Sequence, residues 1–166
     1  MSIIFKRHSV RKFTDEVVSD EKIDSLLKAG MQAPSSCNSQ PWEFIVISSD
    51  EDKQAISKMH RFAKPAAGAS HLIVTLGNLN SAKVIGMIEQ DLGACNENIL
   101  LQATHEGLGA VWLGFHPIED RTLKLKEYLD IPDYCIPFSV ICVGYPAHEG
   151  EVKIRYDESK VHFDRY

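Results

Sequence analysis

The sequence predicts a single domain in which helices alternate with short buried strands. Its 166 residues match the length of one domain. Hydrophobic residues make up 44% of the chain and charged residues 25%, which is the composition of a folded globular protein. Segments with a helical period alternate along the chain with short apolar runs that are rich in β-branched residues.

The first half of the chain contains two predicted helix–strand pairs. In residues 19–33 apolar side chains recur at helical spacing, and Asp and Glu stand in the first turn. Residues 43–48, EFIVIS, form a short apolar run that predicts a buried strand. Residues 49–59 begin with a Ser or Asp cap and predict a helix, and residues 71–78, HLIVTLGN, predict the second strand.

The longest predicted helix runs from Val84 to His105. One face carries a continuous apolar stripe: Ile88, Leu92, Cys95, Ile99 and Ala103. Further apolar residues lie elsewhere around the helix, namely Met87, Ala94, Leu100 and Leu101. A surface helix has a single apolar face, so this helix is expected to be buried on two sides, with a second subunit as one possible cover.

The last third of the chain predicts two more strands, at residues 110–115 and 138–146, with a helix at residues 120–129 between them. Residues 153–166, KIRYDESKVHFDRY, are polar and charged and show little periodicity. A terminal segment of this kind either frays or wraps around another body.

Charge and hydropathy argue against two classes of partner. The net charge of −5 and the pI of about 5.8 do not suit a nucleic-acid-binding protein, which usually presents a wide basic face. No apolar run is long enough to cross a membrane, and the N-terminal segment lacks the long apolar core of a signal peptide. We therefore expect a cytoplasmic protein without nucleic-acid or membrane partners.

The four cysteines and seven histidines show no metal-binding pattern, so no metal site is predicted. Cys95 and Cys142 stand in apolar patterns and are expected to be buried thiols. Cys37 stands in a polar loop and is expected to be exposed. A catalytic role for Cys37 is not favoured, because the sequence assigns no base to it.

A basic cluster stands near the start of this acidic chain, in the segment KRHSVRKF at residues 6–13. Arg7, Ser9 and Arg11 alternate, so on an extended segment their side chains project to the same side. Two guanidinium groups and a hydroxyl can surround a phosphate with charge-assisted hydrogen bonds. A solvated basic turn is the alternative, and this stretch taken alone slightly favours it.

Two other stretches allow either a binding role or a structural one. Residues 33–44, APSSCNSQPWEF, carry short hydroxyl and amide side chains that suit a polar heterocycle, but ordinary turn chemistry also explains them. Residues 107–114, GLGAVWLG, contain glycines that allow a ligand to approach the backbone closely. A helix end followed by a buried strand is the alternative for this second stretch.

Taken together, RHSVRKF, PSSCNSQPWEF, GLGAVWLG and VGYP resemble, in order and spacing, the nitroreductase-like flavoproteins. The resemblance extends from Lys6 to the C-terminal tail and is to the compact members of that family. It implies an α+β fold in which a central, mostly antiparallel sheet is flanked by helices. It also implies one domain over residues 1–166, and a homodimer in which the C-terminal tail reaches the partner subunit.

The resemblance implies that FMN lies in a groove at the dimer interface. An N-terminal cradle is matched by Arg7, His8, Ser9 and Arg11, of which Arg11 would reach the phosphate or the pyrimidine edge of the ring. A loop from the other subunit is matched by Pro34, Ser35, Ser36 and Asn38, with Gln40 as a weaker match. The segment along the ring is matched by Val111, Trp112, Leu113 and Gly114, and a basic pair that closes on the phosphate is matched by Lys153 and Arg155.

The sequence departs from the family pattern in two places. Larger members carry an acidic residue where this chain has Leu113, so the surroundings of the reactive edge of the ring differ. The mid-chain polar contacts that the family makes to the ring have no clear match between Arg61 and Asn80.

The implied activity is that of an FMN-dependent NAD(P)H oxidoreductase of the nitroreductase type. Nitroaromatics, quinones or similar electron-poor small molecules would accept the electrons in a ping-pong mechanism. The flavin would carry the chemistry, so no catalytic side chain is assigned, and the sequence does not choose between NADH and NADPH. Dehalogenation, enoyl reduction or flavin reduction on the same scaffold, or a non-catalytic flavin-binding protein, remain alternatives.

Overall fold

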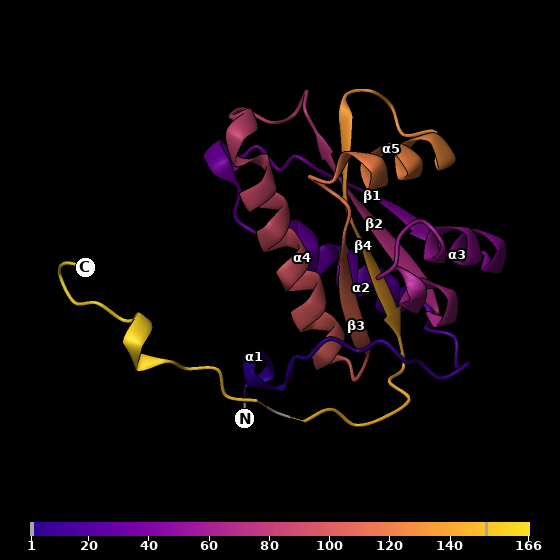
Figure 1. Ribbon diagram of the computed structural model, residues 1–166, viewed down its shortest axis with the longest axis horizontal. Coiled ribbons are helices and arrows are strands. Elements are labelled where there is room, and N and C mark those ends of the chain that lie inside the picture. The colour runs from indigo at the N-terminus through magenta and orange to yellow at the C-terminus, as the bar shows by residue number, and fades with distance from the viewer. Residues whose placement is uncertain (1, 152) are drawn as a thin grey trace.

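The computed structural model describes residues 2–151 and 153–166 (Figure 1). Its strands are β1 (Trp42–Ile47), β2 (His71–Asn78), β3 (Gly109–Gly114) and β4 (Cys135–Gly144). Its α-helices are α1 (Ile3–Lys6), α2 (Asp20–Met31), α3 (Asp50–Ser57), α4 (Ile88–His105) and α5 (Glu119–Tyr128). Short 3-10 helices are η1 (Ser36–Asn38), η2 (Lys64–Gly68), η3 (Ile85–Met87) and η4 (Glu158–Lys160). Within the described part of the chain, no helix has the length and apolar character needed to span a bilayer.

Each predicted strand and helix is present, with differences at the ends. β4 begins at Cys135, three residues before the predicted start at residue 138. The helix predicted from Val84 begins as the 3-10 turn η3 and becomes α-helical only at Ile88. The short helix α1 was not predicted, because four residues are too few for a periodic pattern to show.

The sheet has the strand order β1-β2-β4-β3, and every neighbouring pair is antiparallel. The predicted α+β fold with a central antiparallel sheet is therefore confirmed. β2 and β4 are the central strands, while β1 and β3 are the edges. A strand at an edge keeps one row of backbone N–H and C=O groups free for another partner, and β3 is the edge that matters for the site.

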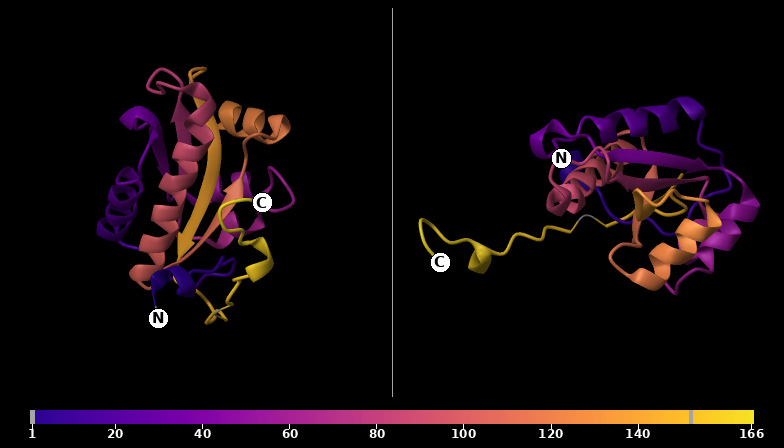
Figure 2. Two further views of the ribbon diagram at one scale, coloured as in Figure 1. Left: turned by 90° about the vertical axis from the view of Figure 1, so that its left-hand side faces the viewer. Right: turned by 90° about the horizontal axis from the view of Figure 1, so that it is seen from above.

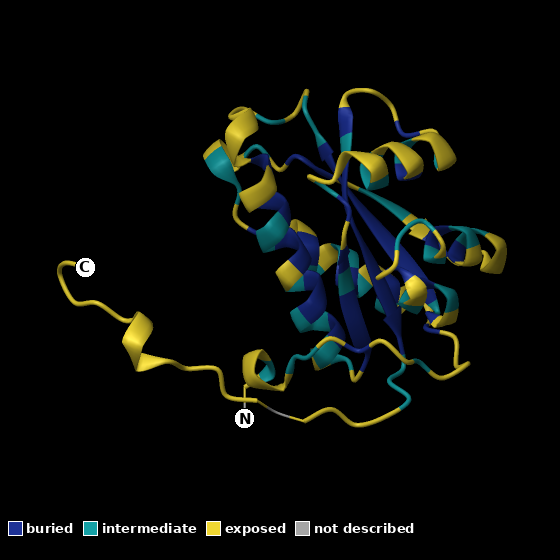
Figure 3. Cartoon of the chain, viewed as in Figure 1, coloured by how far each residue is buried: buried dark blue, intermediate teal, exposed yellow. Residues whose placement is uncertain are grey.

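Helices cover both faces of the sheet (Figure 1). One core cluster joins α2 and α4 to the sheet, and a second joins α3, η2 and α5 to the opposite face. Successive residues of β2 alternate between the clusters, since Ile73 packs in the first while Leu72 and Val74 pack in the second. Because both faces are covered, the strands read as continuous apolar runs, and burial is greatest along β2 and β4 (Figure 3).

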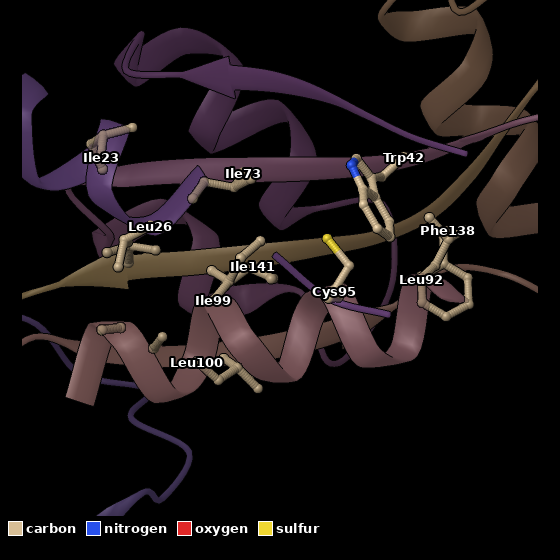
Figure 4. Close-up of a cluster of buried hydrophobic side chains, with 14 of the residues drawn as sticks. Ile23, Leu26, Trp42, Ile73, Leu92, Cys95, Ile99, Leu100, Phe138 and Ile141 are labelled. Atoms are coloured by element: carbon tan, nitrogen blue, oxygen red, sulfur yellow. The ribbon is translucent and has the colours of Figure 1, made fainter. Parts of the chain in front are cut away.

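The predicted apolar stripe of α4 faces the sheet and is fully buried. Figure 4 shows Leu92, Cys95 and Ile99 projecting from α4 toward the residues of the sheet. α2 lies close against this helix, because a Cβ added at Gly30 would come within 2.9 Å of the Ile99 side chain. Of the apolar residues outside the stripe, Leu100 is buried in the same core while Met87 is exposed in this single chain, so burial by a second subunit stays a prediction.

The cysteines lie where the sequence predicted them. Cys95 and Cys142 are buried, and Cys37 is exposed. Burial among apolar groups raises the pKa of the Cys95 thiol to about 12, so this thiol is not ionised near neutral pH.

A polar network crosses the core between α4 and the central strands. Asn96 is fully buried, and its side-chain oxygen accepts a hydrogen bond of 2.8 Å from the Thr75 hydroxyl. Its side-chain nitrogen donates to the Ser139 hydroxyl at 2.7 Å. These two bonds tie α4 to β2 and β4 at one register, because any slip would leave buried polar atoms unpaired.

The segment directly after β4 stays against the body of the protein, and the C-terminal tail that follows extends away from it (Figure 2). Glu151 and residues 153–166 are all exposed. Val152 lies outside the described residues. Phe163 is 85% exposed, and Tyr156 and Tyr166 are also bare to solvent. Large apolar side chains of this kind gain nothing from their own subunit, so they are available to another one.

We predict that Asn96→Ala destabilises the fold by about 1–3 kcal/mol, because it leaves the hydroxyls of Thr75 and Ser139 without their partner. Urea unfolding followed by circular dichroism measures this change. Asn80→Ala is the matched control, since Asn80 is exposed, and a surface change should stay within about 0.5 kcal/mol. Equal unfolding midpoints for the two variants would contradict the role given to the network.

Candidate functional site

The N-terminal basic segment lies along the free edge of β3. The Val10 N–H donates to the Ala110 carbonyl at 3.0 Å, and Ser9 forms a parallel bridge with Ala110. A Cβ added at Gly109 would come within 2.7 Å of the Val10 side chain, so only glycine fits there. The fold thereby joins the basic cluster to the GLGAVWLG segment, far away in the sequence.

The segment that follows β4 meets the same N-terminal segment from the other side. Phe13 bridges Pro146, and the Ala147 N–H donates to the Lys12 carbonyl at 3.0 Å. Further along, His8 packs directly on Gly150, where a side chain would collide with the imidazole. The two ends of the domain therefore lie side by side at one end of the sheet (Figure 1).

A charged hollow of about 400 Å3 opens where these two segments meet. We call it the cationic hollow; its lining consists of His8, Ser9, Arg11, Glu151, Lys153 and Arg155. Three side chains with a permanent positive charge line this space, namely Arg11, Lys153 and Arg155. The lining contains a single carboxylate, that of Glu151, which lies 3.9 Å from the Lys153 ammonium. Such a hollow suits an anion with several oxygen atoms, such as a phosphate.

A larger cavity of about 590 Å3 adjoins the cationic hollow, and Arg11 lines both. We call it the β3 cavity, because Val111, Trp112, Leu113 and Gly114 form one side of it. Its other walls are Arg11, Lys12, His60, Arg61, Phe62, Lys64, Pro65 and Arg121. The volume lies within the range of about 300–1,000 Å3 that is usual for small-molecule sites.

The backbone of β3 offers free hydrogen-bonding groups to this cavity. In an antiparallel pair, alternate residues direct their N–H and C=O groups toward and away from the partner strand. The Ala110 carbonyl points away from β4, toward Val10, so the N–H and C=O of Trp112 must point the same way. The Gly114 carbonyl also points outward and accepts a 3.0 Å bond from Arg121, which leaves the Trp112 amide for a ligand.

His60 is a wall residue of the β3 cavity that sequence reasoning missed. Its ring meets the Phe115 ring edge to face at 4.9 Å between centroids, and its Nδ1 accepts the Phe62 N–H at 3.3 Å. Burial lowers the pKa of His60, and the positive charge of Arg121 lowers it further. The neutral ring therefore carries its proton on Nε2.

Nε2 of His60 is buried and has no hydrogen-bond partner among the described residues. A buried donor usually has a partner, so this nitrogen is a candidate contact for a molecule in the cavity that His60 lines. No motif marks His60 in the sequence. It lies one residue before Arg61, where the interval without a clear match to the family's mid-chain ring contacts begins.

Arg7 lies apart from both hollows. Its side chain forms an ion pair with Glu97 of α4, at 3.4 Å between Nε and Oε1, and it does not belong to the lining of either space. The predicted contact of Arg7 with a phosphate therefore stays a prediction. The other three cradle residues, His8, Ser9 and Arg11, do line the cationic hollow.

The predicted loop residues also lie apart: Pro34, Ser35, Ser36, Asn38 and Gln40 line neither hollow. The buried carboxylate of Asp91 holds this loop, because it accepts the Ser36 N–H at 2.8 Å. Asn38 and Gln40 have φ values of 52° and 48°, a left-handed conformation that costs energy in residues with a side chain. Within one subunit, this ordered loop is not part of the candidate site.

A family model described as the nitroreductase family matches residues 4–75 and 85–145. A protein of Archaeoglobus fulgidus with the provisional name NADH dehydrogenase/NAD(P)H nitroreductase is 38% identical over 170 residues, which cover 100% of this chain and 98% of that protein. A Bacillus subtilis protein named FMN reductase [NAD(P)H] is 28% identical over 92% of this chain and 68% of its own length.

Solved structures of similar proteins also superpose on almost the whole chain. The crystal structure of a Clostridium acetobutylicum protein provisionally named NADH oxidase superposes with a TM-score of 0.97 at 43% identity, covering 99% of this chain and 100% of that one. A provisionally named nitroreductase of Desulfovibrio desulfuricans, solved in complex with FMN, superposes with a TM-score of 0.88 at 31% identity, covering 99% of this chain and 95% of that one.

We predict that the pKa of His60 lies below its ordinary value of 6.5, because both burial and Arg121 disfavour the imidazolium. An NMR titration of the His60 ring protons measures it. Arg121→Gln should raise the pKa of His60 by removing a positive charge, whereas Lys124→Gln, a change of equal charge on the same helix, should not. A value at or above 6.5 in the unmodified protein would contradict this placement.

Proposed function

The chain belongs to the nitroreductase family, and from that premise we propose that it is an FMN-dependent NAD(P)H oxidoreductase. The observation that carries the proposal is the junction of the cationic hollow with the β3 cavity, which share Arg11. The relatives support the same activity, since they are named NAD(P)H nitroreductase and FMN reductase. Both halves of the site have chemistry that fits this cofactor.

The residues present suit each part of a flavin nucleotide. The cationic hollow offers Arg11, Lys153 and Arg155 to a terminal phosphate. The β3 cavity offers apolar side chains to a flat ring, while the Trp112 amide and His60 Nε2 have no partner of their own. Those unpaired groups match a ring that has hydrogen-bonding atoms along one edge.

In this arrangement the phosphate end is held by residues from both ends of the chain. Ser9 and His8 come from the segment paired with β3, and Lys153 and Arg155 come from the segment that follows β4. Arg7 would have to leave Glu97 to join them, which makes it a secondary member of the cradle.

We propose that the site is completed by a second copy of the chain in a homodimer. The strained loop of Pro34, Ser35, Ser36, Asn38 and Gln40 lines no hollow in its own subunit, which is consistent with a role beside the flavin of the partner. The C-terminal tail extends from the body with Tyr156, Phe163 and Tyr166 exposed, so it has the reach to lie across that partner.

FMN, when bound, supplies hydride transfer between NAD(P)H and an electron-poor small molecule such as a nitroaromatic or a quinone. The residues of the chain bind and orient it: cations hold one end, and the β3 backbone and His60 fix the ring. One cavity serves both the donor and the acceptor in turn, which is a ping-pong order. Leu113 is buried in the core beneath the cavity, so this chain places no carboxylate at that position, and no side chain is assigned a catalytic role.

Reduction of free flavin for another enzyme is the second candidate, and the Bacillus subtilis relative named FMN reductase favours it. Dehalogenation, enoyl reduction and non-catalytic flavin binding remain alternatives on the same scaffold. A cytoplasmic location stays a prediction from the sequence.

The visible spectrum of the purified protein tests the proposal. We expect flavin absorbance, present at once or gained on addition of FMN, that bleaches without oxygen when NADH or NADPH is added. A colourless protein that acquires no flavin would remove the proposal. Flavin that binds but is bleached by neither nucleotide would leave the non-catalytic alternative in its place.

We predict that Arg11→Ala weakens FMN binding by about 1.5–3 kcal/mol, or roughly 10- to 150-fold in Kd, because a charge-assisted hydrogen bond to the phosphate is lost. Fluorescence quenching of FMN during titration measures Kd. Lys6→Ala is the matched control: it removes one charge from the same cluster at a side chain that lines neither hollow. If both variants bind FMN equally well, Arg11 is not part of the cradle.

A further inference from the structure

A separate hollow of about 400 Å3 lies at the start of β2. We call it the acidic hollow; its lining consists of residues 14–17, Ser48, Asp50, Lys53 and residues 67–71. It shares no lining residue with the cationic hollow or the β3 cavity. β4 separates β2 from β3 in the sheet, so a molecule in the acidic hollow would not occupy the proposed flavin site.

The wall formed by residues 14–17 is held at both ends. The Thr14 N–H donates to the Tyr145 carbonyl at 2.9 Å, and the Val18 N–H donates to the Ser70 hydroxyl at 2.8 Å. These two bonds tie the segment to the end of β4 and to the start of β2. The acidic hollow is therefore formed by one subunit before any ligand binds, which lowers the cost of binding.

The single cation of the acidic hollow is already fully engaged. Lys53 is buried, and its ammonium donates to the carbonyls of Ala69 and Ser70 at 3.0 and 3.2 Å. Its third proton faces the Asp50 carboxylate at 2.8 Å. Lys53 therefore has neither a proton nor an uncompensated charge to offer to a ligand.

Two further carboxylates in the lining keep their charge uncompensated. Among the residues that the structure describes, neither Asp15 nor Glu16 forms an ion pair. Val17 stands beside them in the lining and is 75% exposed. A hollow with a surplus of one charge attracts counter-ions, and the apolar side chain can cover the carbon atoms of an organic one.

His71 gives the acidic hollow one directed donor. The residue is only 5% exposed, and its Nδ1 lies 2.9 Å from the Ser70 hydroxyl oxygen. That oxygen already accepts the Val18 N–H, so we assign its own proton to a bond with Nδ1, which places the ring proton on Nε2. Burial lowers the pKa of His71, and Lys53 lowers it further while Asp20 acts in the opposite direction, so the ring is neutral near pH 7.

Nε2 of His71 has no hydrogen-bond partner among the described residues. This atom keeps contact with solvent, in contrast to Nε2 of His60, which is fully enclosed. A buried ring that lines a hollow with one free donor calls for an acceptor on whatever binds there. No three His, Cys, Asp or Glu side chains in the described part of the chain are grouped to hold a metal ion, so the expected cation is organic.

We propose that the acidic hollow binds a small organic ammonium compound that also carries an oxygen acceptor, such as an amino amide or an amino alcohol. Asp15 and Glu16 hold the ammonium group, and Nε2 of His71 donates to the oxygen. Val17 covers the carbon atoms between them. A carboxylate on the ligand would be repelled by the two acidic side chains, so free amino acids are disfavoured. The inference does not rest on the proposed function, because it uses none of the residues that would hold FMN.

Three matched probes test the proposal by binding. β-Alaninamide has both an ammonium group and a carbonyl oxygen, whereas propanamide lacks the ammonium group and butylammonium lacks the oxygen. Each is titrated into the full-length protein at pH 7.5 and constant ionic strength, and NMR follows the ring signals of His71. We expect saturable, millimolar binding of β-alaninamide, as suits so small a molecule, and at least about threefold weaker binding of the other two, because each lacks one polar contact.

Asp15→Asn and Glu16→Gln test the acidic side chains, and because both residues are exposed the fold tolerates these changes. Each variant should weaken β-alaninamide about three- to fivefold, as for an exposed ion pair, and leave propanamide unchanged. Glu51→Gln is the matched control, since it removes an exposed carboxylate from the first turn of α3 that does not line the acidic hollow. It should change neither probe, and FMN affinity should be the same in all three variants.

The proposal is overturned if β-alaninamide causes no saturable change in the His71 signals, or if butylammonium binds as tightly. It is also overturned if Glu51→Gln weakens β-alaninamide as much as the two lining variants do, because the attraction would then be to the net negative charge of the protein. Absence of flavin in every preparation would defeat the proposed function and leave this comparison unaffected.

Discussion

The pairing of Val10 with Ala110 is the contact on which the rest of the site depends. β3 is an edge strand, and a bare edge is a row of unpaired donors and acceptors. The basic segment covers the first half of that edge and so places Ser9 and Arg11 beside it. In the second half the outward groups of Trp112 stay free, whereas the Gly114 carbonyl accepts a bond from Arg121. One edge thus supplies both an anchor for cations and a surface for a ring.

This edge keeps its shape because the sheet behind it is covered on both faces. α2 and α4 cover one face, α3 and α5 cover the other, and β2 and β4 are almost wholly buried between them. The Asn96 network sets the register of α4 on these strands. A platform of this kind has little freedom to move, so the walls that it supports can be positioned closely. The parts that no such packing holds are the tail and the exposed cations.

Charge is distributed against the overall sign of the protein. An acidic chain concentrates cations along one cavity and its adjoining hollow, with Arg11 between them. His60 lies in the same wall but is kept neutral by burial and by Arg121, so it offers a directed donor rather than another charge. Arg7 keeps its charge, but its side chain forms an ion pair with Glu97 outside both spaces. Similar residues therefore have different roles according to what they touch.

The sequence by itself determined the elements of the fold, because the periodicity of apolar residues is a local property that survives without the tertiary structure. Its resemblance to a family also pointed to Arg11, Lys153 and the β3 segment, although spacing alone could not say that they meet. Only the tertiary structure brought His60 and Arg121 into one cavity and turned Arg7 toward Glu97. Those placements depend on contacts between distant segments, and no local pattern encodes which side chain a folded neighbour will face.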